Sequence, residues 1–215
     1  RKAVWGVLGE RGKCKPMDGR VCGDVGLGKT EVALRASFRA ASGGRQVVLL
    51  CPTTVLAEQN YQTFRARLAG FPVNVGLLSR FVTRPRQKEV LKAAATGQVD
   101  ILIGTRRGLS SDVKLPNLAL LILDEEQRFG VRHKEKLKAL KKNVDVLTLT
   151  ATPIPRTLQL SMYGIRALSI IDDEPQARKP VASAVLRREG SVLRKVLARA
   201  IAREGQAFCD SNRDQ

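Results

Sequence analysis

Short apolar runs alternate with stretches of helical periodicity along most of this chain. The apolar runs predict buried parallel strands at residues 20–22, 46–51, 73–78, 99–103, 118–123, 144–150 and 168–171. Apolar residues at helical spacing predict helices at about 30–41, 54–68, 86–95, 133–142 and 155–162. This alternation predicts an α/β fold, with a mostly parallel sheet, right-handed crossovers and helices on both faces.

A polar segment, DDEPQARKP at residues 172–180, predicts a linker because it carries two prolines and few apolar residues. Residues 1–171 before it are expected to form one domain. Beyond it follow a predicted strand at 181–186, a basic amphipathic helix at 191–203 and an apolar start at 206–209. This part is too short to bury a core of its own. Residues 181–215 are therefore interpreted as the incomplete start of a second domain.

The composition indicates a globular protein, because 43% of the residues are hydrophobic. No stretch reaches the roughly 18 consecutive apolar residues of a membrane-spanning helix, so no membrane partner is expected. The four cysteines form no C-x-x-C pair, and His133 is the single histidine, which makes a zinc site improbable. Cys22 and Cys51 lie in apolar runs and are predicted to be buried thiols of a reduced, cytoplasmic protein.

The charge balance suggests a polyanionic partner. Lysine and arginine number 38 against 20 aspartates and glutamates, a formal net charge of +18. Aromatic residues make up only 4%, so contact with a nucleic-acid backbone is favoured over base stacking. A solvated basic surface without a partner is the alternative.

Residues 23–30, GDVGLGKT, match every fixed position of the phosphate-loop pattern G-x-x-x-x-G-K-[ST]. Glycines let the backbone curl so that its N–H groups cradle phosphates, and the helix that follows directs its positive end at the same anion. Lys29 is predicted to contact the β- and γ-phosphates and Thr30 to hold Mg²⁺. The predicted cofactors are ATP and Mg²⁺, and the cofactor-binding residues are Gly23, Asp24, Val25, Gly26, Leu27, Gly28, Lys29 and Thr30.

A pair of carboxylates, Asp124 and Glu125, directly follows the apolar run at 118–123. The first is suited to hold Mg²⁺ and the second to polarise a water for attack on the γ-phosphate. Thr150-Ala151-Thr152 follows another predicted strand. Ligands of parallel sheets bind beyond the carboxyl ends of the strands, so these segments and the phosphate loop are expected to meet at one edge.

Four ordered segments, GDVGLGKT, PTTVLAEQ, DEEQRFGVRHKEK and TATPIPRTL, carry a family resemblance. Over about residues 14–180 the chain resembles the first RecA-like motor domain of superfamily 2 helicases, and among these the bacterial transcription-repair coupling factors, with the RecG helicases as near relatives. The resemblance implies a RecA-like P-loop NTPase fold, and it implies that residues 181–215 begin a second RecA-like domain.

The resemblance also implies roles for individual residues. Asp124 would serve Mg²⁺, Glu125 would activate water, and Gln127 would sense the γ-phosphate, so that Lys29 and these three form the catalytic set. Thr150 and Thr152 would couple hydrolysis to DNA movement. Residues expected along the DNA backbone are Pro52, Thr53, Thr54, Gln59, Gly104 and Thr105. Thr53 could equally be a helix cap, and Arg80, with Arg84 and Arg86, could touch DNA or lie in a solvated loop.

The function implied is an ATP-dependent double-stranded DNA translocase motor of a transcription-repair coupling factor, which displaces RNA polymerase during DNA repair. RNA polymerase and nucleotide-excision-repair proteins would bind through domains outside these residues. The adenine-recognition segment and the arginine finger are expected outside them as well, and Arg106 stands where the family often has histidine. The alternatives are the motor of a RecG-like fork-remodelling helicase and a nucleotide-dependent DNA-binding module without turnover.

Overall fold

The computed structural model of this chain describes residues 17–24, 26–110, 112–129, 144–151, 167–171 and 190–208. The chain divides into two compact units, residues 1–176 and 177–215, which are described separately. Several predictions lie outside the described residues: the helices at 133–142 and 155–162, the linker at 172–180 and the strand at 181–186. Val25, His133 and Thr152 also lie outside them.

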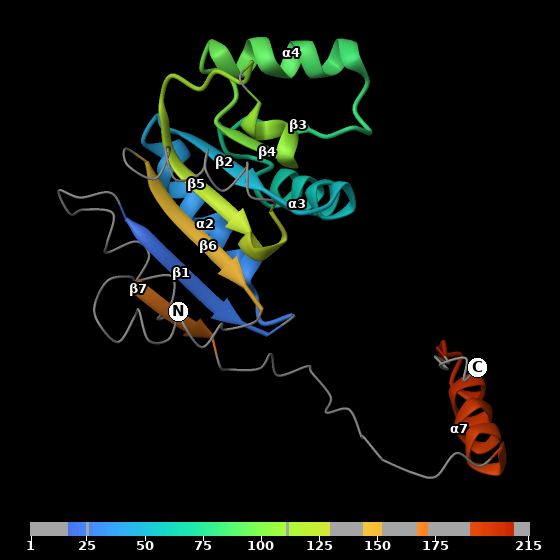
Figure 1. The fold of residues 1–215 in the computed structure, drawn as a ribbon. Coiled ribbons are helices and arrows are strands. Elements are labelled where there is room, and N and C mark those ends of the chain that lie inside the picture. The colour runs from blue at the N-terminus through green and yellow to red at the C-terminus, as the bar shows by residue number, and fades with distance from the viewer. Residues whose placement is uncertain are drawn as a thin grey trace. The chain divides into compact units, whose positions relative to one another are not determined.

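Within its described residues, the first unit contains a seven-stranded sheet (Figure 1). All its strand pairs are parallel, and the order is β3-β4-β2-β5-β6-β1-β7. The strands are β1 (Asp18–Gly23), β2 (Gln46–Leu50), β3 (Val75–Leu78), β4 (Ile101–Gly104), β5 (Leu118–Asp124), β6 (Asp145–Thr150) and β7 (Ala167–Ile171). Each of the seven predicted strands is present, with bounds that differ by up to two residues. The first strand begins two residues earlier than predicted, and the strand predicted at 73–78 begins two residues later.

Helices cover both faces of this sheet, as predicted. Helices α2 (Lys29–Ser42) and α3 (Thr54–Arg67) pack on one face, against strand residues such as Leu49 and Ile122. Helix α4 (Arg84–Ala95) packs on the other, against residues such as Leu102. Neighbouring residues of a strand point to opposite faces, so a strand covered on both sides is apolar throughout. The five residues of β2 are all buried for this reason.

The strand order divides the sheet into two halves at its carboxyl edge. Strands β5, β6 and β1 are neighbours on one side, and β2, β4 and β3 are neighbours on the other. The phosphate loop follows β1, and the acidic residues follow β5, so the two predicted nucleotide segments flank β6. The segments predicted to contact DNA follow β2, β3 and β4. The two predicted functions therefore occupy adjacent halves of one sheet edge.

The described part of the second unit contains helix α7 (Gly190–Ala202), within one residue of the helix predicted at 191–203. Its moderately apolar face leaves Leu193, Val196 and Ile201 more than half exposed. Whether residues 181–215 begin a second RecA-like domain stays a prediction.

Candidate nucleotide site

The turn between β1 and α2 depends on two glycines. Gly26 and Gly28 have φ angles of 87° and 81°, in the left-handed region that side chains rarely adopt. The turn is closed by the Leu27 N–H, which donates to the Asp24 carbonyl at 3.3 Å. Apart from its chain neighbours, no described residue has an atom within 4 Å of the position a Cβ would take at either glycine. The space beside the turn is therefore open to a ligand at the N-terminus of α2.

The side chain of Lys29 folds back over this turn. Its Nζ donates to the Gly23 carbonyl at 2.7 Å and to the Asp24 carbonyl at 3.1 Å. The lysine is the first residue of α2, so its ammonium group lies beside the N-terminus of the helix, where the backbone N–H groups point outward. This concentration of positive charge is suited to an anion such as a phosphate chain.

A cavity of about 530 Å³ joins the phosphate loop to the acidic strand end. It contains the loop residues Lys29 and Thr30 together with Asp124, Glu125 and Gln127. The structure thus brings together the side chains that the sequence predicted to act on one nucleotide. The cavity is also lined by Gly26, Gly28, Leu56, Leu149 and Ala151.

Glu125 has an unusual backbone conformation. Its φ and ψ are 51° and 58°, the left-handed region, which costs a non-glycine residue about 1 kcal/mol or more. Two hydrogen bonds to β6 and its end hold it there. Its N–H donates to the Leu149 carbonyl at 2.9 Å, and its Oε1 accepts from the Ala151 N–H at 3.0 Å. Strained backbone clusters at functional sites, and here it directs a carboxylate into the cavity.

The acidic segment contributes three further polar side chains. Asp124 is the last residue of β5 and is partly buried. The Gln127 amide donates to the second carboxylate oxygen of Glu125, so these two predicted catalytic residues contact each other. Glu126 points elsewhere, to Arg20 of β1 at 3.4 Å. Neighbouring carboxylates thus have different surroundings: Asp124 and Glu125 line the cavity, and Glu126 is not among its lining residues.

The predicted DNA-contacting residues lie at the ends of β2, β4 and β3. Thr53 is exposed and caps α3, since its Oγ1 accepts from the Leu56 N–H at 3.2 Å. The predicted cap is therefore confirmed, and contact of Thr53 with DNA stays a prediction. Pro52 and Thr54 are half-buried beside it, and the side chain of Gln59 is exposed further along α3.

Gly104 is the last residue of β4, and Arg80 follows the carboxyl end of the neighbouring strand β3. Gly104 is buried, and a Cβ there would lie 2.7 Å from the Leu78 carbonyl oxygen. A glycine is therefore required by the close approach of the two strands. Thr105 after it is half-buried. Arg80 is exposed, and its guanidinium lies 5.4 Å from the centre of the Phe81 ring.

Two neighbouring arginines after β4 differ in their contacts. Arg106, at the position where the family often has histidine, is exposed. Arg107 pairs with Asp112, with one N–O distance of 2.6 Å, and this hydrogen bond lowers the pKa of the Asp112 carboxyl. Arg106 is thus the better placed of the two to meet an external anion.

Both predicted buried thiols, Cys22 and Cys51, are buried in the structure, and neither is in a disulfide. Cys51 follows β2 and accepts a hydrogen bond from the Asn60 amide at 3.3 Å. Burial raises the pKa of its thiol to about 12, against 9.0 for an unperturbed cysteine. Cys51 is therefore an inert packing residue at neutral pH.

Sequence reasoning missed three residues that line the cavity. Leu56 comes from the first turn of α3, Leu149 is the penultimate residue of β6, and Ala151 offers its backbone N–H. The contribution of the Ala151 backbone N–H cannot be predicted from the residue type, because every residue except proline has such a group. The TAT segment was nevertheless predicted to lie at this edge of the sheet. Thr150, predicted to couple hydrolysis to movement, is 2% exposed within β6.

The glycine turn, the acidic strand end and this strand order define a helicase-type P-loop motor domain. A match to the DEAD/DEAH box helicase family covers residues 8–161. The chain belongs to that family.

The chain is similar to curated transcription-repair-coupling factors. It is 56% identical over 199 residues to the one from Bacillus subtilis strain 168, covering 93% of this chain and 17% of that protein. It is 51% identical over 214 residues to the one from Staphylococcus aureus strain USA300, covering 100% of this chain and 18% of that protein. The chain therefore spans less than a fifth of the length of these relatives.

Among solved structures, the chain is similar to RecG bound to a three-way DNA junction. The TM-score is 0.81 at 32% identity, over 96% of this chain and 28% of that one. The Hef helicase domain of Pyrococcus furiosus matches with a TM-score of 0.56 at 21% identity, over 78% of this chain and 38% of that one, and shares the fold alone. These similarities confirm the predicted RecA-like helicase fold.

The described part of the chain contains no helix that is both long and apolar enough to span a membrane.

Proposed function

We propose that this chain is the ATP-binding half of a motor that moves along double-stranded DNA, within a transcription-repair coupling factor. The observation that carries the proposal is the placement of two sets of residues on one sheet edge. The nucleotide cavity lies at β1, β5 and β6, and the candidate DNA surface, defined as Pro52, Thr53, Thr54, Arg80, Thr105 and Arg106, lies at β2, β4 and β3.

ATP and Mg²⁺ would be held by groups that already face the cavity. Lys29 would exchange its bonds to the loop carbonyls for the β- and γ-phosphates, and the N–H groups at the start of α2 would bind the same chain. Thr30 and Asp124 offer the hard oxygen ligands that Mg²⁺ prefers. The bound metal would neutralise charge that develops on the phosphates.

Glu125 would act as the general base toward an attacking water. Its carboxylate is held by the Ala151 N–H and by the Gln127 amide, so it is oriented before a substrate binds. Gln127 lines the same cavity and could exchange its contact with Glu125 for one with the γ-phosphate. That exchange would make the orientation of Glu125 dependent on the nucleotide.

Helix α3 offers a direct connection between the nucleotide and DNA. Leu56, in its first turn, lines the nucleotide cavity, while Thr53 at its N-cap lies on the candidate DNA surface. A shift of this turn on hydrolysis would change the contacts of both the nucleotide and DNA. The TAT segment offers a second route, because Ala151 contacts Glu125 and lies between Thr150 and Thr152.

DNA as the partner is supported by charge and by relatives. The net charge of +18 favours a polyanion, and the similar RecG structure contains a three-way DNA junction. Displacement of RNA polymerase and contact with excision-repair proteins rest on the name of the curated relatives and would need parts beyond these residues. A bacterial DNA motor of this kind would work in the cytoplasm. The resemblance to RecG keeps fork remodelling as the second candidate.

The test is the mutual dependence of nucleotide and DNA affinity. A motor must bind duplex DNA with different affinities in its ATP and ADP states. By linkage, DNA must then change the relative affinity for ATP and ADP by the same ratio. Duplex affinity is measured by fluorescence anisotropy with ADP and with a non-hydrolysable ATP analogue. Equal DNA affinity in both states would contradict a motor function. A three-way junction bound much more tightly than a linear duplex would favour fork remodelling.

A further inference from the structure

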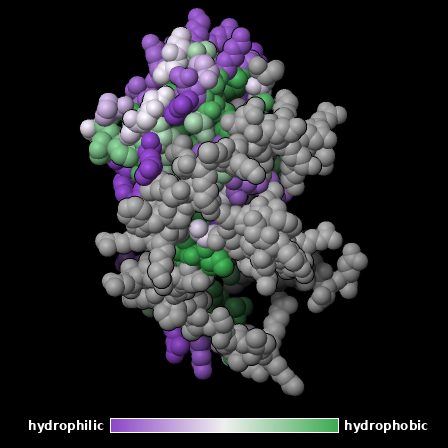
Figure 2. Space-filling view, turned by 90° about the vertical axis from the view of Figure 1, so that its left-hand side faces the viewer, coloured by the Kyte–Doolittle hydropathy of each residue, from purple (hydrophilic) through white to green (hydrophobic). Residues whose placement is uncertain are grey.

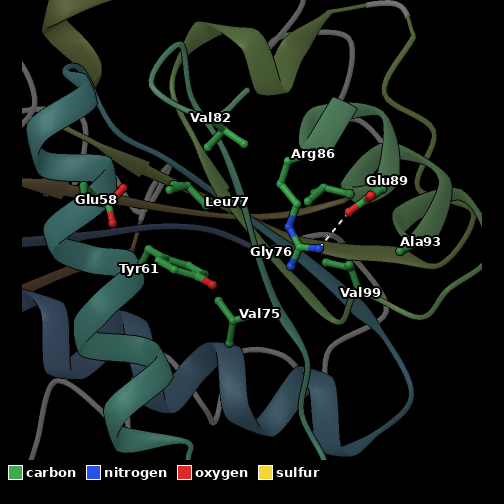
Figure 3. A pocket seen from close by; sticks show the side chains of 11 residues that line it. Glu58, Tyr61, Val75, Gly76, Leu77, Val82, Arg86, Glu89, Ala93 and Val99 are labelled. Atoms are coloured by element: carbon green, nitrogen blue, oxygen red, sulfur yellow. Dashed lines mark hydrogen bonds and ion pairs between the residues drawn. The ribbon is translucent and has the colours of Figure 1, made fainter. Parts of the chain in front are cut away.

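A groove of about 380 Å³ lies at the outer edge of the sheet, along β3 (Figure 3). Strand β3 is the last in the sheet and pairs only with β4 among the described strands. Figure 3 shows α3 on one side of it, with Tyr61 and Glu58 pointing inward, and α4 on the other, with Arg86, Glu89 and Ala93. The groove is thus a trough with an edge strand as its floor.

The floor offers backbone groups that β4 does not use. In a parallel ladder, alternate residues bond to opposite neighbours. The Asn74 carbonyl accepts from the Ile101 N–H at 3.1 Å, which assigns Asn74, Gly76 and Leu78 to the β4 side. The N–H and C=O groups of Val75 and Leu77 therefore point away from β4, on the side of the groove. A strand edge without a neighbouring strand among the described residues is a template for one more strand.

The walls are apolar at the bottom and charged at the rim. Val75, Leu77 and Val82 line the groove together with Val90 and Ala93 of α4. Exposed phenyl rings lie beyond both ends of β3: Phe71 is 54% exposed and Phe81 is 63% exposed. On the side of the molecule that lies at the left of Figure 1, Figure 2 shows hydrophilic and hydrophobic residues intermixed over the upper, described part of the surface. An occupant must therefore bring apolar side chains as well as a backbone.

The rim is acidic, unlike the chain as a whole. Glu58 and Glu89 line it together with one arginine, Arg86, which pairs with Glu89 at 2.7 Å. Glu58 accepts from the neutral Gln62 amide and forms no ion pair within the described residues. A chain of net charge +18 thus carries an uncompensated carboxylate at this groove. This charge repels a nucleic-acid backbone and attracts lysine or arginine.

We propose that the groove is a strand-addition site for a partner protein, which docks an extended segment of alternating β-branched residues flanked by a basic residue. Its backbone pairs with Val75 and Leu77, its apolar side chains enter the space between Tyr61 and Ala93, and its basic residue meets Glu58. A second copy of this chain is a poorer occupant, since α3 and α4 flank its own β3 and would collide with those of the first copy.

The probe is the fluorescein-labelled peptide acetyl-Lys-Val-Thr-Val-Thr-Val-Lys-amide, added to the 215-residue chain. Anisotropy is expected to show saturable binding, weakened by about threefold or more when both lysines of the peptide are replaced by glutamate. A peptide with proline at the central valine loses a backbone donor and is expected not to bind. Amide hydrogen exchange followed by NMR should show new protection at Val75 and Leu77 in the complex.

Two variants assign the binding to the groove. Ala93→Phe fills the space beside β3 and should weaken peptide binding at least about tenfold. Ala95→Phe, at an exposed position of the same helix, should leave peptide binding unchanged. Glu58→Gln removes the unpaired charge and should abolish the preference for the lysine peptide while leaving nucleotide affinity unchanged. Binding that survives Ala93→Phe, or leaves the two amides unprotected, overturns the proposal. A dimer in solution that Ala93→Phe dissociates would assign the groove to a second copy and also overturn it.

Discussion

The backbone N–H of Ala151 donates a hydrogen bond to the Glu125 carboxylate at 3.0 Å. This contact joins the ends of β5 and β6 across the nucleotide cavity. It keeps the carboxylate oriented although the backbone of Glu125 is in the left-handed region. Glutamine in place of Glu125 keeps an oxygen acceptor for the same N–H but loses the base. Glu125→Gln is therefore expected to preserve the local structure, to lose ATP hydrolysis and so to serve as the negative control for ATPase measurements.

Lys29→Ala should weaken the binding of MgATP and MgADP. Charged hydrogen bonds of this kind contribute about 1.5–3 kcal/mol each, so losing the ammonium group should raise the dissociation constant by about 10- to 100-fold. Calorimetric titration measures it. Thermal unfolding without nucleotide provides the control, because the lysine also bonds the Gly23 carbonyl. An unchanged affinity would remove the phosphate loop from the nucleotide site.

The elements and the residue types of the nucleotide site were predictable from sequence. Buried parallel strands are apolar throughout and are bounded by polar or glycine residues, so each strand end could be located. The strand order was not predictable, because the neighbour of each strand depends on the face of the sheet over which each connecting helix crosses. The adjacency of Leu56 to the phosphate loop follows from that order. The left-handed conformation of Glu125 was also unpredictable, because tertiary hydrogen bonds enforce it against its local preference.

Gly104→Ala should destabilise the fold. Its Cβ would lie 2.7 Å from the Leu78 carbonyl oxygen, and backbone cannot move aside as a flexible side chain can. Overpacking of this kind lowers the free energy of unfolding by about 1–3 kcal/mol. In urea unfolding this appears as a lower midpoint concentration with an unchanged m-value. Gly43→Ala, where the new Cβ meets ordinary contacts, should stay within about 0.5 kcal/mol. Equal stabilities for the two variants would contradict the close approach of β3 and β4.

Cys51 should resist alkylation in the folded protein up to high pH. The reactive form is the thiolate, and burial raises the pKa of the folded thiol to about 12 from 9.0. Because the folded pKa is the higher one, the protonated thiol favours the folded state below about pH 9, and that stability is lost as pH rises from 9 toward 12. Peptide-resolved mass spectrometry after iodoacetamide treatment at pH 7.5 and 9.5 checks this, with the urea-unfolded chain as the reactive control. Rapid labelling of folded Cys51 at pH 7.5 would exclude its burial.

Arg80→Ala should weaken duplex DNA binding without changing sequence preference. If Arg80 contacts a phosphate, the slope of log affinity against log salt should fall by about one. Arg67→Ala is the matched control. Arg67 is also exposed but pairs with Glu31 at 3.1 Å at the other end of α3, away from the carboxyl edge of the sheet. Identical salt slopes for Arg80→Ala and the parent chain would leave Arg80 a solvated residue.

Turnover by this chain alone is expected to be very slow and to respond little to duplex DNA. The cavity holds the candidate base Glu125 and the candidate Mg²⁺ ligands Thr30 and Asp124. Among the described residues, Lys29 is the cation that lines the cavity. The charge that builds on the γ-phosphate in the transition state needs a second cation. In the family that this chain resembles, an arginine from the second RecA-like domain supplies it. Such a residue is worth about 10³- to 10⁵-fold in rate, or roughly 4–7 kcal/mol.

Extending the polypeptide through a second RecA-like domain should therefore raise turnover by orders of magnitude and make it depend on DNA. Steady-state ATPase rates are compared for the short and the extended chain, each with its Glu125→Gln variant as the blank. The blank matters because a base contributes about 10²- to 10⁴-fold, so contaminating ATPase activity would hide a weak rate. Nucleotide affinity should change far less than the rate, since the added arginine acts mainly on the transition state. A short chain that hydrolyses ATP as fast as the extended one would show that this domain needs no cation from a second domain.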